Sequence, residues 1–305
     1  MGWVKKGLVY CPAGLGGWRD NSFLCPQPFL LDNETIRVYG SFRDREGVGR
    51  IGYVDVMASN PSHVLNVSRQ PVLVLGSPGT FDDNGQILGD VLRVGDEVRM
   101  YYVAFQKVGK VKFYAFSGLA ISKDGGNTFT RVARVPVMDR AEEGIFGRCI
   151  HSVLQERDVF RVWYSVIYDW TFIAGIPYPT YDIKYIESAD GINFGAEGVP
   201  CVKCRGDEYR IGRPRVKRNA AGYYEMRYTS DTMDKKYRSG YAESPDGIHW
   251  TRKDELAWLA PSPSGFDDEM ACYPVEIETK YGRYMFYDGN GMGRTGFGYA
   301  KLDEG

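Results

Sequence analysis

The stretch SKDGGNTF, residues 122–129, decides the fold because it recurs along the chain. It returns as SADGINF at residues 188–194 and as SPDGIHW at residues 244–250. Asp-Gly supplies the left-handed backbone of a hairpin turn, and the aromatic residue that follows begins the next strand. Two further copies, GYVD at residues 52–55 and GYAK at residues 298–301, lack the turn. Copies at a period of about sixty residues account for the whole chain.

Other strands recur in step with these copies, so each copy belongs to a larger unit. An apolar inner strand and a second strand precede every copy, and an outer strand is predicted to follow, for example at residues 66–75 and 130–138. The second strands read RVYGS (37–41), RMYYV (99–103), RVWYS (161–165), EMRYT (225–229) and YMFYD (284–288). Four-stranded sheets repeated around an axis are the β-propeller solution to exposed sheet edges.

The sequence therefore predicts one all-β domain over residues 1–305, a five-bladed β-propeller with four antiparallel strands in each blade. The last unit ends at GYAK without an outer strand. We expect WVKKGLVY, residues 3–10, to supply that strand and to close the ring. The predicted blades cover roughly residues 22–75, 83–138, 146–203, 209–259 and 269–302.

Charge and composition exclude several classes of protein. The formal net charge is −1, so no basic excess predicts nucleic-acid binding. No apolar run of about 18 residues occurs and no secretory signal opens the chain, so we expect no membrane span and a cytoplasmic location. The six cysteines are then expected to be thiols. Cys201 and Cys204 form a single CxxC pair with no nearby histidine, so neither a metal nor another cofactor is predicted. The sequence pattern does not indicate which oligomeric state the protein has.

The repeats and an FDD segment resemble the five-bladed propellers of glycoside hydrolase families 32, 43 and 130. The sequence looks still more like glycosyl hydrolase-like proteins encoded in bacterial O-antigen or capsule clusters. The stretches that carry this resemblance are IRVYGSFRDR, FDDNG, AISKDGGNTF, YDIKYIESADGINF, GYAESPDGIHW, FDDEMACYP and GFGYAKL. The resemblance implies a carbohydrate or sugar-phosphate ligand and cleavage of a glycosidic bond by hydrolysis or phosphorolysis.

The repeat separates structural acids from candidate catalytic ones. FDD occurs twice, and a feature that recurs in several blades is expected to serve the blade. Asp82 and Asp267 are therefore predicted to bond backbone N–H groups in the turns that lead into the inner strands. The three copies that contain Ser-x-Asp-Gly share what we call the SxDG turn. The same logic assigns their acids to hairpin turns: Asp124, Asp190 and Asp246. Glu269 has Asn84 as its counterpart, so it is the acid predicted to be catalytic.

Inner strands line the central channel of a propeller, and alternate residues face it. This alternation predicts a polar set at the channel mouth: Glu269, Tyr273, Arg213, His151, Gln86, Asn84 and Gln27. The alternative is a hydrated channel with no ligand. His151 is predicted to be either an axial acid–base group or a satisfied core histidine.

Further residues are predicted to bind the ligand. Arg148, Arg213 and Arg215 are suited to bidentate anion binding, the alternative being salt bridges to Glu142, Asp207 or Glu208. The aromatic connection at residues 167–182, with Trp170, and the segment around Trp18 are predicted to wall a sugar site by stacking, or else to form a dimer contact.

This sequence lacks one of the carboxylates that the resemblance to glycoside hydrolases implies. The resemblance implies an Asp-Pro on the first inner strand, where this sequence has Gln27 and Pro28, unless Asp20 reaches in from the preceding loop. Three hypotheses remain. The first is a hydrolase with Glu269 as general acid and Asp83 or Asp90 as base. The second is a phosphorylase-like enzyme, or one acting on an anionic sugar, whose anion is held by Arg148, His151, Arg213 and Arg215. The third is a non-catalytic sugar-binding or scaffold protein.

Overall fold

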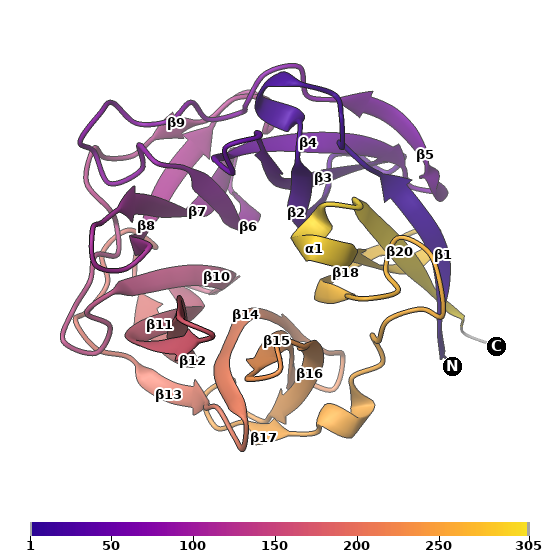
Figure 1. Cartoon of the computed structure of the whole chain (residues 1–305). Coiled ribbons are helices and arrows are strands. Elements are labelled where there is room, and N and C mark those ends of the chain that lie inside the picture. The colour runs from indigo at the N-terminus through magenta and orange to yellow at the C-terminus, as the bar shows by residue number, and fades with distance from the viewer. Residues whose placement is uncertain (1, 304–305) are drawn as a thin grey trace.

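The computed structural model describes residues 2–303, and nearly all of their regular structure is β. Seen down one axis, the sheets follow one another in chain order around a common centre (Figure 1). The helical elements are short: the 3-10 turns η1 (Gly17–Arg19) and η2 (Asp254–Leu256), and the helix α1 (Asn290–Gly293). The predicted all-β class is confirmed. No helix within residues 2–303 has the length and apolarity needed to cross a membrane.

Antiparallel pairing connects consecutive strands into five groups, which we number in chain order. Group one is β2 (Ser22–Leu30), β3 (Thr35–Arg43), β4 (Gly49–Met57) and β5 (Asn60–Val67). Group two is β6 (Gln86–Val94), β7 (Glu97–Lys107), β8 (Phe113–Ser122) and β9 (Thr130–Arg131). Group three is β10 (Gly147–Glu156), β11 (Val159–Ile173), β12 (Ile176–Ser188) and β13 (Val199–Val202).

Group four is β14 (Glu208–Arg218), β15 (Tyr224–Thr232), β16 (Tyr237–Ser244) and β17 (Thr251–Arg252). Single parallel pairs, Gly147 with Ala115 and Tyr181 with Arg210, join groups two, three and four into one twelve-stranded sheet. Group five is β18 (Cys272–Thr279), β19 (Gly282–Asp288) and β20 (Phe297–Asp303), whose outer neighbour is β1 (Gly2–Tyr10). The N-terminal strand thus pairs antiparallel with the last strand of the described residues.

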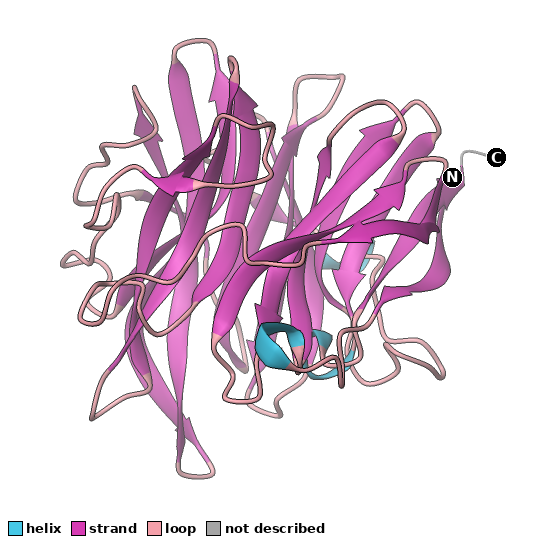
Figure 2. Ribbon diagram, turned by 90° about the horizontal axis from the view of Figure 1, so that it is seen from above, coloured by secondary structure: helices cyan, strands magenta, loops and turns pink. Residues whose placement is uncertain are grey.

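Two predictions about the strands are wrong. The outer strands predicted at residues 66–75 and 130–138 are mostly irregular, since β5 ends at Val67 and β9 has two residues. Pro71 and Pro136 lie in those stretches and cannot donate to a ladder. The connection at residues 167–182, expected as a loop, is a continuous extension of the β11–β12 hairpin, paired up to Ile173 and Ile176. Figure 2 shows one long hairpin projecting beyond the other turns.

The SxDG turns have the predicted local chemistry, and they also join neighbouring groups. In the first turn, Asp124 accepts the backbone N–H groups of Asn127 and Thr128, both at 3.0 Å. The turns of Asp190 and Asp246 repeat this pattern. The turn carbonyls accept bonds from aromatic side chains of the preceding group: Tyr39 to Gly126, Tyr101 to Gly191 and Trp163 to Gly247. Each Asp-Gly turn therefore holds two adjacent groups together.

Asp82 and Asp267 are structural, as predicted, but their partners are side chains and not turn N–H groups. Asp82 is 1% exposed, pairs with Arg131 and accepts the Tyr102 hydroxyl. Asp267 pairs with Lys5 at 2.5 Å and accepts a hydroxyl from Tyr287 at 3.2 Å. The aligned tyrosines of groups three and four meet Glu143 and Asp254 in the same way. A tyrosine–acid contact is thus a repeated core feature.

Candidate functional site

Every inner strand is interrupted by a β-bulge near the axis. The pairing register shifts around residues 25–26, 89, 151, 213–214 and 273–274. Cys25, Arg213 and Tyr273 there have φ of 61°, 54° and 56°, the left-handed region that costs a non-glycine residue roughly 1–2 kcal/mol. A bulge re-aims the side chains beside it. Backbone strain is therefore present at three of the five bulges.

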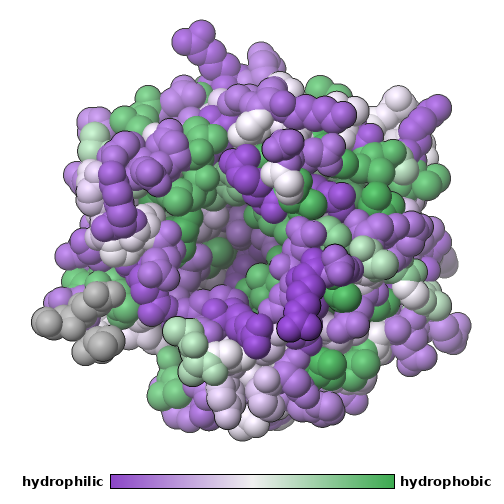
Figure 3. Space-filling model, turned by 180° about the vertical axis from the view of Figure 1, so that it is seen from behind, coloured by the Kyte–Doolittle hydropathy of each residue, from purple (hydrophilic) through white to green (hydrophobic). Residues whose placement is uncertain are grey.

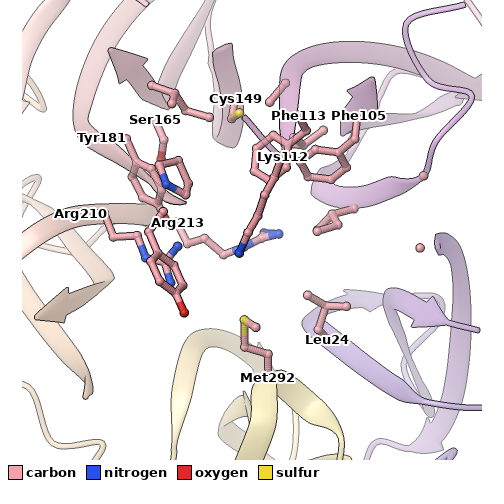
Figure 4. A pocket seen from close by; sticks show the side chains of 18 of the residues that line it. Leu24, Phe105, Lys112, Phe113, Cys149, Ser165, Tyr181, Arg210, Arg213 and Met292 are labelled. Carbon is pink, nitrogen blue, oxygen red and sulfur yellow. The ribbon is translucent and has the colours of Figure 1, made fainter. Parts of the chain in front are cut away.

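A pocket of about 390 Å³ opens at one end of the axis, and we call it the axial pocket. Its walls come from all five groups and from α1. Figure 4 shows the labelled side chains pointing into it from several sides. Its charged, histidine and tyrosine side chains are Arg43, Lys107, Lys112, His151, Tyr178, Tyr181, Arg210, Arg213, Tyr237 and Tyr273.

The charge of the axial pocket is one-sided. Among residues 2–303, five cationic side chains line it and no aspartate or glutamate does. Arg43, Lys107 and Lys112 form no hydrogen bond or ion pair through their side chains within the described residues. Within residues 2–303, Arg213 donates only to the Leu88 carbonyl, at 2.9 and 3.1 Å. These four cations form no ion pair in this part of the chain, so an anionic ligand would be favoured there.

Arg210 is the pocket cation that forms an ion pair with a carboxylate. Asp231, 1% exposed, accepts from Arg210 at 2.7 Å and from Lys235 at 2.5 Å. The Tyr209 hydroxyl donates to the same oxygen. The guanidinium also donates to the Tyr237 hydroxyl. Asp231 thus fixes the direction of Arg210 and Lys235 without itself lining the pocket.

The other polar groups of the pocket are neutral. Burial raises the pKa of Tyr181, Tyr237 and Tyr273, so their hydroxyls stay protonated and can donate hydrogen bonds. Burial, followed by the charges of Arg213 and Arg215, lowers the pKa of His151 well below its usual value. Its Nδ1 is buried without a partner within the described residues. His151 is therefore a neutral imidazole.

Part of the wall formed by groups two and three is apolar. Ile87, Val103, Phe105, Phe113 and Ile167 line it. Trp170 lies behind this wall, with its ring 5.2 Å from Phe113. Aromatic and apolar surfaces of this kind suit the C–H faces of a sugar ring.

A buried carboxyl lies close behind the pocket. Asp288, at the end of β19, is 0% exposed, and both of its oxygens accept the Cys25 N–H, at 3.1 and 3.0 Å. The same position in groups one and four is Ser41 or Thr229, which accepts the equivalent N–H of the next inner strand. Burial raises the pKa of Asp288 to about 8, against the N–H of Cys25 and the charges of Arg213 and Arg43. Asp288 therefore carries a proton near neutral pH.

A second cavity of about 240 Å³ lies further along the inner strands. Figure 3, the view from behind, shows a hollow near the centre of that face, rimmed mainly by hydrophilic side chains. Asp90 lies 3.4 Å from Arg215 here, and Gln27 lines the same cavity. Burial raises the pKa of Asp90 to about 6 and lowers that of Arg215 to about 10. Arg215 also donates to the carbonyl of His151.

The structure divides the predicted channel-facing set between these two cavities. Asn84, His151, Arg213 and Tyr273 line the axial pocket. Gln27, Asp90 and Arg215 line the second cavity. The remaining predicted site residues line neither: Glu269, Asp83, Gln86, Arg148, Trp18 and Trp170.

The strand placement predicted for Glu269 is wrong. β18 begins at Cys272, so Glu269 lies in the preceding loop and is exposed. Its backbone N–H donates to the Asn290 side chain at 2.8 Å. The alternation of a strand does not extend to residue 269, which is why the side chain does not face the pocket. A catalytic role for Glu269 stays a prediction that this placement does not support.

Gln86 and Arg148 point into the sheets and not toward the axis. Gln86 is 0% exposed and donates to Asp82 at 3.0 Å. Arg148 is 4% exposed and pairs with Glu143 at 2.7 Å. The salt-bridge alternative for Arg148 is thus the one observed, with Glu143 in place of Glu142.

Three further residues have local partners outside both cavities. Asp83 accepts the N–H of Gly79 at 2.7 Å. Asp20 accepts the N–H of Gly16 at 2.8 Å and pairs with Arg45, so it does not replace the missing first carboxylate. Trp18 packs edge-on against Phe42, with ring centroids 4.9 Å apart.

Several pocket residues were not predicted from the sequence. They are Arg43, Lys107, Lys112, Arg210, Tyr237 and Met292, whereas Tyr178 and Tyr181 belong to the connection at residues 167–182 that was predicted to wall the site. The sequence held two signals of this region, neither of which identifies those residues. Cys25, Arg213 and Tyr273 each precede a proline at aligned positions, and these are the three strained bulge residues. The repeat also shows Asp288 as the one acid among serine, threonine and valine counterparts.

Solved structures similar to this protein are glycoside hydrolases of the propeller type. A glycosyl hydrolase from Bacteroides ovatus has a TM-score of 0.70 and 15% identity, with 100% of this protein and 91% of that one covered. A thermostable family-43 glycoside hydrolase has a TM-score of 0.67 and 14% identity, with 93% and 89% covered. These likenesses show the fold, and the predicted resemblance to glycoside hydrolase propellers is confirmed.

No family model matches the sequence. Two curated relatives from Mycobacterium tuberculosis match it over 304 residues at 31% identity: "Uncharacterized protein Rv1502" of strain H37Rv and "Uncharacterized protein MT1551" of strain CDC 1551. The match covers 99% of this protein and 100% of each relative. The chain therefore belongs to the family of Rv1502.

Proposed function

We propose that this protein is a five-bladed, glycoside hydrolase-like propeller that binds an anionic carbohydrate in the axial pocket. The single observation that carries the proposal is the charge of that pocket. Within the described residues it is lined by five cations and by no carboxylate, while the whole protein has a formal net charge of −1. Positive charge gathered in a pocket raises the local concentration of anions and so favours an anionic ligand.

In this proposal the five strand groups are the five blades, at roughly the predicted boundaries, and β1 closes the ring. The repeated tyrosine–acid contacts and Asp-Gly turns support a common blade plan. All five bulges then face one axis, which places the pocket where the blades converge.

The carbohydrate part of the proposal rests on the apolar wall and on the neutral hydroxyls. Tyr181, Tyr237 and Tyr273 can donate to sugar oxygens, while Phe105 and Phe113 present apolar faces. One similar solved structure is described with the words "mannoside phosphorylases" and "beta-1,2 mannosidic linkages", and its TM-score is 0.69 at 14% identity, with 99% of this protein and 90% of that one covered. The resemblance to polysaccharide-cluster proteins supports a cytoplasmic role in bacterial surface polysaccharide metabolism.

Binding is the activity that the geometry supports best. Hydrolysis by two carboxylates needs a pair flanking the scissile bond, and no acid lines the axial pocket within residues 2–303. A second candidate is hydrolysis or phosphorolysis with one general acid. Asp288 favours it, because its carboxyl accepts the N–H of Cys25, next to the pocket-lining Leu24, and burial keeps it protonated near neutral pH; it lies behind the lining, so proton transfer to a ligand would need its side chain to reach the pocket.

Calorimetry with a panel of anionic and neutral oligosaccharides tests the proposal. Anionic glycans should bind, and their affinity should fall as salt is added. Arg43→Gln should weaken that binding about tenfold, which corresponds to about 1.4 kcal/mol. Arg69→Gln is the matched control, since Arg69 is exposed and lies outside the pocket lining. Equal affinity for neutral and anionic glycans, or no binding at all, would refute the proposal.

Assays of turnover distinguish binding alone from hydrolysis or phosphorolysis. Release of reducing sugar, or phosphate-dependent release of a sugar phosphate, would establish catalysis. Asp288→Asn should then abolish turnover while glycan binding is retained. Binding without turnover by wild-type protein across the panel would leave binding as the activity.

A further inference from the structure

Three cationic groups surround the ring of Tyr178, which lines the axial pocket. Two of them, Lys112 and Arg210, line the pocket as well, and Lys235 lies outside its lining. Lys235 Nζ lies 4.1 Å and Lys112 Nζ 4.6 Å from the centre of the Tyr178 ring, and the Arg210 guanidinium carbon lies 5.8 Å away. We call these three cations the Tyr178 cation cluster. Lys112 immediately precedes β8, Arg210 lies on β14, and Lys235 lies in the β15–β16 turn. Segments from two strand groups thus bring their charges to a side chain of a third.

This cluster has more positive charge than the protein neutralises. Asp231 is the carboxylate that pairs with Arg210 and Lys235, at 2.7 and 2.5 Å. Lys112 has no ion pair within residues 2–303. Three cations therefore face one carboxylate. Burial, together with the charges of Arg210 and Lys112, lowers the pKa of Lys235.

The excess of about two charges distinguishes between anions. A carboxylate brings one negative charge and two oxygens. A phosphate monoester brings about −1.5 to −2 at pH 7 and three strong acceptor oxygens. Its oxygens can meet three cationic groups at once, and charge-assisted bonds of this kind are the strong ones. The cluster therefore matches a phosphoryl group better than the carboxylate of an acidic sugar.

A series of side-chain contacts connects the Tyr178 cation cluster to the bulge residues of the axial pocket. The Tyr237 ring lies 5.3 Å from the Arg210 guanidinium and 6.1 Å from the Tyr273 ring. Tyr273 in turn lies 5.3 Å from the guanidinium of Arg213. A phosphoryl group at the rim would leave the attached sugar to extend toward these bulge residues.

We propose that the ligand of the axial pocket is a sugar phosphate, whose phosphoryl group is held by Lys112, Lys235 and Arg210. This inference rests on the proposed function and narrows its substrate class. Inorganic phosphate is the simplest probe, because it needs no knowledge of the sugar.

The test compares inorganic phosphate with acetate at equal ionic strength, by the shift each causes in the melting temperature. Phosphate should raise the melting temperature and acetate should not. Lys112→Gln should weaken phosphate binding about tenfold. Lys110→Gln on the same turn is the control and should bind as wild type does, since Lys110 is exposed and lies outside the pocket lining. Calorimetry with glucose 1-phosphate and glucuronate then repeats the comparison on sugars.

The outcomes separate this inference from the proposed function. If phosphate stabilises no more than acetate while uronate-containing glycans bind, the sugar-phosphate inference falls and the proposed function stands. The inference also falls if Lys112→Gln binds phosphate as well as Lys110→Gln does. If neither phosphate nor any anionic glycan binds, both fall together.

Discussion

The two cavities along the inner strands differ in how their charges are satisfied. In the second cavity, Glu276 meets Lys217 at 2.5 Å, Arg283 at 2.9 Å and also Arg227, while Asp90 meets Arg215. In the axial pocket, Arg43 and Lys112 have no carboxylate within the described residues. Charges that are paired within the protein belong to its fold, because removing one partner leaves the other buried and uncompensated, whereas unpaired cations that converge on a pocket indicate a ligand. The axial pocket is therefore the functional cavity in our proposal.

The largest effect is expected from Glu276→Gln in the second cavity. The Glu276 side chain is 8% exposed, and its loss leaves Arg227 and Arg283 without a carboxylate within the described residues and Lys217 with Glu225 alone. Removing one partner of a buried ion pair costs about 3 kcal/mol. Urea denaturation should show that loss. Arg283→Gln is the matched control: its side chain is 35% exposed, so it should cost less than about 1 kcal/mol.

The pH dependence of that stability has a definite sign. Burial acts to raise the pKa of Glu276, but the charges of Arg227 and Lys217 hold it at about 2. The stabilisation is present above the ordinary carboxyl pKa and is lost as pH falls toward 2. Wild type should thus lose stability in acid more steeply than Glu276→Gln. Parallel curves for the two proteins would show that these ion pairs do not hold the second cavity together.

A smaller effect is expected from Asp288→Asn beside the axial pocket. Because the pKa of Asp288 is raised to about 8, its contribution is complete below the ordinary carboxyl pKa and is lost as pH rises through 8. Wild-type melting temperature should therefore fall between pH 5 and 8 by more than that of Asp288→Asn. Thermal melts across this range check the difference. A variant with the same slope would mean that Asp288 is ionised already at neutral pH.

The smallest effect on stability is expected from Arg43→Gln in the axial pocket. The Arg43 side chain has no hydrogen-bond or ion-pair partner among the described residues, so the free energy of unfolding should change by less than about 0.5 kcal/mol. Urea denaturation without ligand measures this. A fall of about 2 kcal/mol or more in the free energy of unfolding would mean that Arg43 supports the fold. It would remove the contrast between the axial pocket and the second cavity.

Much of the fold could be predicted because its signals are local. The Asp-Gly turn depends on a few adjacent residues, so SKDGGNTF and its copies predicted hairpins that the structure contains. Repetition of Asp82 as Asp267 correctly indicated structural acids. Their partners could not be predicted, because Arg131 and Lys5 reach them from strands far away in the sequence.

The candidate site was predicted only in part. Side chains alternate along a regular strand, and this placed Gln86 and Asp90 on one face. The bulge at Gly89 lies between them, so Gln86 points to Asp82 and Asp90 to the second cavity. A Cβ at residue 89 would lie 2.5 Å from the Ile150 carbonyl oxygen, so the bulge needs glycine.

The sequence by itself determined the repeat, the all-β class, the turns and the structural acids, because each follows from a short pattern with its own chemistry. Tertiary structure decided which side chains reach the axis. The bulges reset the alternation of every inner strand, the loop before β18 exposes Glu269, and Lys112, Arg210 and Lys235 meet at Tyr178 only when separate strand groups are placed side by side. Convergence of distant segments is a property of the packed structure, and no local pattern encodes it.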